Sequence, residues 1–89
     1  MEYQRTLDLV FEVAKEFSKR RGWAQQSTVL REVANRIGNA QEEQTQQQIL
    51  TCWHDLFRLG RLSWGVNFDN PDAPFYHIPH EDPQRQKIA

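Results

Sequence analysis

The sequence predicts an α+β fold that is mostly α, with three helices followed by a C-terminal β-hairpin. Apolar residues recur at helical spacing in three successive segments, and the period changes to alternation after Gly60. With 89 residues, three Trp, five Phe and two Tyr, the chain has enough large apolar side chains for one small core. We therefore expect one domain over residues 1–78 and a flexible tail over residues 79–89.

The first two helices are predicted from amphipathic stripes and from the residues that end them. The first runs from about Tyr3 to Arg20, and the second from about Thr28 to Ile37, with Ser27 as its N-cap and Gly38 as its stop. The apolar stripes that predict them are Leu7, Val10, Phe11, Ala14 and Phe17 in the first helix, and Leu30, Val33, Ala34 and Ile37 in the second.

The middle of the third helix is predicted more clearly than the residue at which it begins. Capping-box spacing allows it to begin near Asn39, with Glu42, or near Thr45, with Gln48. Its apolar face ends at Gly60 and consists of Ile49, Trp53, Leu56 and Phe57, helped by Leu50 and Leu59.

After Gly60 the alternation predicts a hairpin. Leu62, Trp64 and Val66 share one side of a first strand, residues 67–74 have the composition of a loop, and residues 75–78 form the returning strand. Since Trp64 is on the apolar side of its strand and Trp53 is on the third helix's stripe, we expect both indoles in the core.

This layout resembles a winged helix-turn-helix, in which a hairpin covers the open side of three helices. The resemblance rests on residues 56–65, LFRLGRLSWG, where a third helix turns into a wing strand. Residues 64–71, WGVNFDNP, and 74–77, PFYH, are also similar to small uncharacterised bacterial winged-helix proteins. The resemblance covers most of residues 3–78 and contains no catalytic motif, so it implies architecture and binding rather than catalysis.

If the third helix enters a DNA groove, its polar side contacts the bases. Gln can bind adenine bidentately and Arg can bind guanine in the same way. The expected base-contacting residues are Gln44, Gln47, Gln48, Thr51 and Arg58. The expected phosphate contacts are Lys19, Arg20, Arg21 and Arg36. Because so few cations give weak affinity per monomer, we expect a regulator that binds double-stranded DNA as a homodimer.

The alternative is a protein-interaction adaptor. The first half of the chain is mildly basic and the second half mildly acidic, within a net charge of −1. The predicted wing loop has Asp69 and Asp72 where a phosphate-binding wing has Lys or Arg, and Phe68 and Tyr3 are candidates for exposed rings. Phe68, Asp69 and Asp72 are thus the expected contacts with a basic partner. The small size and the acidity of the chain would also allow such an adaptor to be associated with a phage or a mobile element.

Other function classes find little support. Cys52 is the single cysteine, which excludes an intramolecular disulfide and fits a reducing, cytoplasmic compartment; no leader or membrane span is indicated. The chain has no phosphate loop, dinucleotide fingerprint or serine elbow. His54, His77 and His80 with Cys52 lack the paired spacing of a zinc site. We expect no enzyme, no cofactor and no metal.

Overall fold

A computed structural model of the chain describes residues 2–21, 25–65, 69 and 75–79. The fold is α+β and mostly α, with three helices followed by a two-stranded antiparallel sheet. Its elements are α1 (Tyr3–Arg21), α2 (Gln26–Ile37), α3 (Glu43–Arg58), β1 (Ser63–Trp64) and β2 (Tyr76–His77). The predicted fold class is confirmed.

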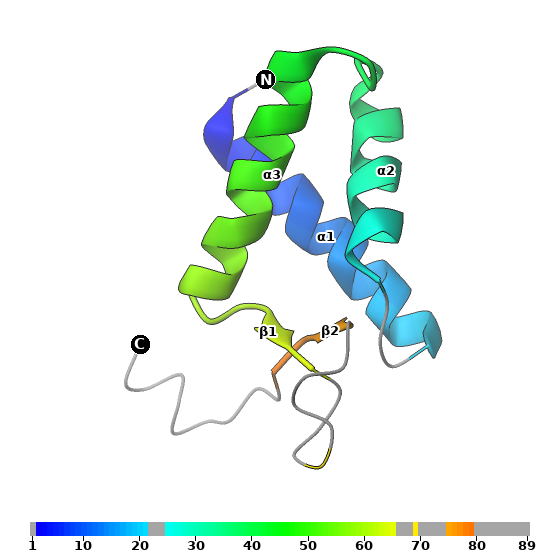
Figure 1. The fold of residues 1–89 in the computed structure, drawn as a ribbon, viewed down its shortest axis with the longest axis vertical. Helices are drawn as coiled ribbons and strands as arrows, with labels where there is room; N and C mark the ends of the chain where they lie inside the picture. Colours follow the sequence, from blue (N-terminus) through cyan, green and yellow to red (C-terminus); the bar gives the residue numbers. More distant parts are fainter. Residues whose placement is uncertain (1, 22–24, 66–68, 70–74, 80–89) are drawn as a thin grey trace.

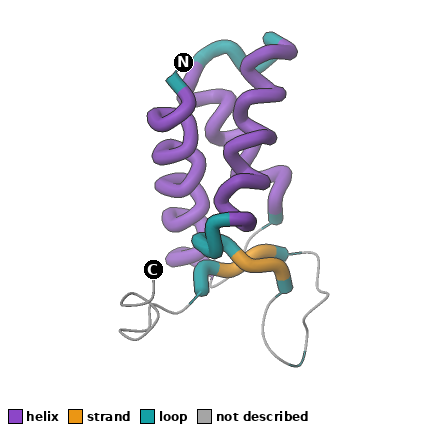
Figure 2. The backbone as a smooth tube through the Cα atoms, turned by 90° about the vertical axis from the view of Figure 1, so that its left-hand side faces the viewer, coloured by secondary structure: helices purple, strands orange, loops and turns teal. Residues whose placement is uncertain are grey.

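The three helices pack on one another and the hairpin closes one end. α2 and α3 run in opposite directions and are joined by the short connection 38–42, while α1 crosses behind both (Figure 1). The hairpin lies at the end of the molecule where α3 finishes, as Figures 1 and 2 both show. α1 therefore covers one side of the α2/α3 pair only.

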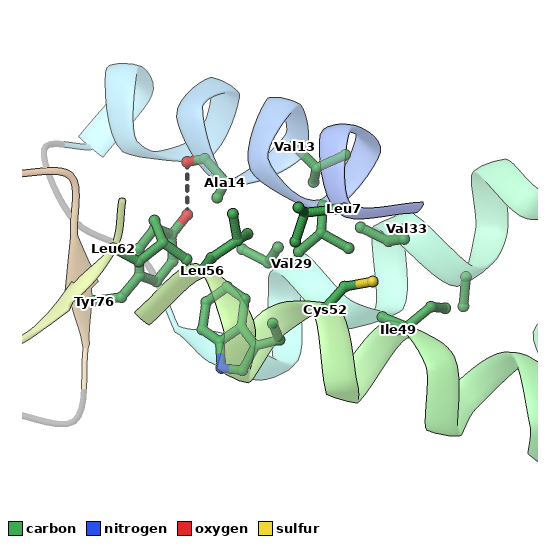
Figure 3. Packing of buried hydrophobic residues seen from close by; sticks show 13 residues of the cluster. Leu7, Val13, Ala14, Val29, Val33, Ile49, Cys52, Leu56, Leu62 and Tyr76 are labelled. Carbon is green, nitrogen blue, oxygen red and sulfur yellow. Dashed lines mark hydrogen bonds between the residues drawn. The ribbon is translucent and has the colours of Figure 1, made fainter. Parts of the chain in front are cut away.

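The core is formed by the apolar stripes of all three helices and by two side chains of the hairpin region (Figure 3). Val13 and Val29 are fully buried although they stand outside the predicted stripes, whereas Phe11, Phe17 and Leu30 pack only partly at the core's edge. The buried apolar residues are Leu7, Val10, Val13, Ala14, Val29, Val33, Ala34, Ile49, Cys52, Trp53, Leu56, Leu62 and Tyr76.

Tyr76 joins the hairpin to the helices. Its hydroxyl donates to the Ala14 carbonyl of α1 over 2.7 Å (Figure 3), and its ring meets Trp53 edge to face with centroids 5.1 Å apart. The strands pair over two residues only, Ser63 with His77 and Trp64 with Tyr76. Side-chain packing therefore positions the hairpin more than the sheet does.

The predicted stops of two helices are confirmed, but their predicted starts are wrong. Gly38 and Gly60 follow α2 and α3 with φ of +92° and +77°, a conformation that glycine adopts without strain. α2 begins at Gln26 after the N-cap Gln25, so Ser27 is not its cap. The Gln26 side chain accepts a 3.0 Å hydrogen bond from the Trp53 indole, which ties this first turn to α3.

α3 also begins elsewhere than predicted. It starts at Glu43 after the N-cap Glu42, so it starts neither at Asn39 nor at Thr45, and its N-cap makes no side-chain capping bond. Thr45 is buried in the first turn of α3, where it faces the core rather than the helix end.

Three side chains of the predicted apolar faces lie at the surface. Trp64 is 42% exposed, Leu50 37% and Leu59 55%. Leu62 is buried, but β1 is so short that the chain has passed the edge of the core at Trp64, whose ring lies at a tilt against half-buried Phe57. The expected Trp64 core position was wrong, and an exposed indole stands beside α3.

Candidate functional site

The outer face of α3 presents most of the predicted base-contacting residues. Gln44, Gln47 and Thr51 are exposed at steps of three and four residues, so they share one side of the helix. Gln48 is half-buried and already takes part in an interaction within the chain. The exposed stripe ends at Arg58, the only Lys or Arg of α3.

Arg58 is already paired with a carboxylate. Its guanidinium lies 3.0 Å from Asp55, one turn earlier on α3, and Asp55 also accepts a hydrogen bond from the Tyr3 hydroxyl of α1. These two donors, the Tyr3 hydroxyl first, lower the pKa of Asp55, and the Asp55 carboxylate raises the pKa of Tyr3. The cation of the α3 face is therefore partly neutralised within the fold.

The predicted phosphate contacts do not join this face. Arg36 on α2 is held between Glu16 at 2.6 Å and Glu32 at 2.9 Å, which raises its pKa. Lys19 and Arg20 are exposed at the C-terminal turn of α1, which lies on the opposite side of the molecule from α3 (Figure 1). Arg21 ends α1, and its side chain lies outside the described residues.

The remaining cations differ in their surroundings. Lys15 and Arg61 both lie over the Phe11 ring, each 4.9 Å from its centroid, and Lys15 also pairs with Glu12 at 3.3 Å. Arg31 on α2 is exposed and forms no ion pair within the described part of the chain.

A concave surface lies between α2 and α3. This interhelical groove, of about 560 Å³, is lined by residues of α2, of α3 and of the connection between them, and by none of α1. Leu30, Ala34, Ile49 and Leu50 supply its apolar surface. Its remaining lining residues are Ser27, Arg31, Asn35, Ala40, Gln41 and Gln46.

A second, smaller hollow adjoins the C-terminal half of α3. This aromatic pocket, of about 260 Å³, is lined by Gln26, Trp53, His54, Phe57 and Trp64. Phe57 meets Trp53 edge to face at 5.1 Å and lies at a tilt against Trp64 at 5.7 Å. The rings offer apolar surface, while Gln26 and the exposed His54 supply polar groups.

The groove and the pocket follow one another along the same helices. On α3, Leu50 lines the groove, and His54 and Phe57, four and seven residues later, line the pocket. On α2, the adjacent residues Gln26 and Ser27 line the pocket and the groove respectively. Sequence reasoning missed this surface, although Leu50, an apolar residue off the main stripe, was a signal for it.

The other predicted site residues contribute little to the candidate site. Phe68 and Asp72 lie outside the described residues, and Asp69 is exposed and takes part in an interaction within the chain. Cys52 is buried, which raises the pKa of its thiol to about 11.

Among the described residues, no three His, Cys, Asp or Glu side chains are placed to hold a metal ion. Nor does the described part of the chain contain a helix of the length and apolarity that a membrane span needs.

Comparison of the chain with protein-family models, with curated proteins and with solved structures gives no match. Proposals about its function therefore depend on its own surfaces.

Proposed function

We propose that this chain is a protein-interaction module that binds its partner along the interhelical groove and the aromatic pocket. The observation that carries the proposal is the apolar surface that the fold leaves in water around these hollows. Leu50 is 37% exposed at the groove and Trp64 42% exposed at the pocket. Apolar and aromatic side chains around a concave surface with a polar rim are typical of the centre of a protein interface.

The distribution of charge supports a protein partner over DNA. DNA binding takes much of its affinity from cations that replace the counterions of phosphates. Arg36 and Arg58 already have carboxylate partners, and Lys19 and Arg20 lie away from α3. The groove needs no such cations, since its contacts would be mainly apolar.

Site-specific photo-crosslinking in cells of the source organism tests the proposal. A photoreactive amino acid replaces Leu50 in the groove or, as the matched control on the same helix, Gln47 on the outer face of α3. We expect a discrete protein adduct from position 50 that position 47 does not give. Adducts of equal strength from both positions, or none from position 50, would refute a groove-directed interaction.

DNA binding by a winged-helix dimer of regulator type is the second candidate, because the exposed polar stripe of Gln44, Gln47 and Thr51 favours it. Anisotropy of labelled duplex DNA at low and near-physiological salt tests it. A negative salt slope that is lost with Gln47→Ala and Thr51→Ala together would support it, and no binding at low salt would reject it. Under either function we place the chain in the cytoplasm, an assignment that the free thiol of Cys52 supports.

A further inference from the structure

We infer that the partner presents an amphipathic helix with an acidic polar side, which lies in the interhelical groove with a large apolar side chain in the aromatic pocket. This inference rests on the proposed function and names the class of its partner. The evidence is the shape of the surface, the kinds of side chain along it and the charge of its rim.

The shape fits a helix. α2 has 12 residues, which corresponds to a length of about 18 Å, or about three helical turns. A helix of that length presents apolar residues at i, i+3, i+4 and i+7 to a groove of this kind. Small Ala34 and half-buried Leu30 with Leu50 leave room for aliphatic side chains, and the rings of Phe57 and Trp64 surround space for a larger one.

The charge of the lining residues favours a partner helix with acidic polar positions. Among the described residues that line the two hollows, Arg31 is the only one with a fixed charge, and none of them is Asp or Glu. Arg36 on the same helix is clamped by two glutamates, whereas Arg31 has no carboxylate partner in the described part of the chain. An acidic partner would supply that carboxylate, and a basic partner would meet Arg31 with like charge.

Two exposed acidic residues at one end of the groove limit where the partner's charges can lie. Glu42 and Glu43 are exposed at the N-terminal end of α3, beside lining residues Ala40 and Gln41. They would repel carboxylates at that end of the groove. The partner's acidic residues should therefore lie near Arg31 and toward the hairpin, not beside the connection between α2 and α3.

A second copy of the chain is a poorer occupant. The fully buried apolar side chains of α1 lie in the core, and the exposed residues of its outer side are polar or charged apart from Tyr3. α2 and α3 likewise use their main apolar stripes inside the fold. Apart from the groove and the pocket themselves, the described residues of the three helices leave no continuous apolar face to insert into the groove of another copy.

Two labelled peptides of about 15 residues test the inference against the full chain. Both have the same Leu face at i, i+3, i+4 and i+7, and the polar positions are all Glu in one and all Lys in the other. By fluorescence anisotropy at low salt, we expect the Glu peptide to bind about tenfold more tightly. The difference should shrink as salt is added.

Variants locate the binding. Arg31→Glu should remove the preference for the Glu peptide, and Arg5→Glu, an equal change of charge on the exposed outer side of α1, should retain it. Leu50→Glu should weaken binding of both peptides. Binding of neither peptide, equal binding of both, or equal effects of Arg31→Glu and Arg5→Glu would overturn the acidic-helix inference.

These failures differ from a failure of the proposed function. If both peptides bind equally and Leu50→Glu abolishes both, the assignment of charge fails while groove binding stands. If neither peptide binds but position 50 still crosslinks a protein in cells, the helical class fails and the interaction module stands. Only the absence of a groove-specific protein adduct at position 50 removes both.

Discussion

Replacement of Tyr76 tests how the hairpin is held against the helices. Its side chain is fully buried between Ala14, which accepts its hydroxyl hydrogen bond at 2.7 Å, and Trp53, which it meets edge to face. Burial also raises the pKa of Tyr76, so the hydroxyl stays protonated and donating in neutral solution. Because β1 and β2 pair over two residues each, the backbone ladder alone contributes little to docking.

The structure gives the two substitutions different magnitudes. Tyr76→Phe removes one neutral hydrogen bond, which contributes about 1 kcal/mol net. Ala14 lies inside α1, where its carbonyl can still accept the helical amide bond, so no acceptor is orphaned. Tyr76→Ala also removes the ring beside Trp53 and leaves a cavity, and we expect a loss of about 3–5 kcal/mol.

Thermal unfolding followed by far-ultraviolet circular dichroism measures both. About 1 kcal/mol corresponds to about 4–8 °C in Tm for a domain of this size, so Tyr76→Phe should be resolved from the native chain. Tyr3→Phe is the matched control, because it removes an exposed hydroxyl bond to Asp55, and it should cost less. A native Tm for Tyr76→Phe, or equal losses for Tyr76→Phe and Tyr3→Phe, would refute the assigned role of the buried bond.

Three further predictions concern a helix end, a carboxylate and the thiol. A Cβ on Gly38 would meet nothing within 4 Å at φ +92°, so Gly38→Ala should cost about 1 kcal/mol of unfolding free energy through backbone strain alone; an unchanged urea midpoint would contradict this. The hydrogen bond from Tyr3, with those from Arg58, holds the pKa of Asp55 below its ordinary 3.8, so Asp55 contributes stability above that pH which is lost as pH falls through its lower folded pKa. Melting curves at falling pH should therefore show a smaller acid loss for Asp55→Asn than for the native chain, and parallel curves would count against the pairing. Burial, with the charge of Asp55, raises the pKa of Cys52 to about 11, so maleimide at neutral pH should label it slowly in the folded chain and rapidly in urea; rapid labelling without urea would place the thiol at the surface.

The helices were predictable because the spacing of apolar residues that indicates a helix can be read from the local sequence. The stop at Gly38 was predictable for the same reason, since a glycine after a helix marks a left-handed residue. The start of α2 was not. Its first residue, Gln26, accepts a hydrogen bond from Trp53, 27 positions away, a contact that only the tertiary fold brings together.

The site was harder to predict than the fold, because it depends on which side of each element its neighbours cover. Alternation assigned Leu62 and Trp64 to one side of a strand, but tertiary packing decides that the core ends between them. The partners of Arg36 show the same limit. Glu32 is four residues away and visible in the sequence, whereas Glu16 approaches it only because α1 crosses α2.

Binding on the outer face of α3 and binding in the groove differ in the ion pairs that they would break. To bind phosphates, Arg58 would have to break its ion pair with Asp55, and Arg36 would have to break its ion pairs with Glu16 and Glu32. Each step exchanges one ion pair for another, so the gain per phosphate is smaller than for a free cation. The groove requires no exchange, because Arg31 has no carboxylate partner in the described chain and Leu50 is already in water. Binding there buries apolar surface without breaking any contact described in the fold, which makes the groove the better site for a partner.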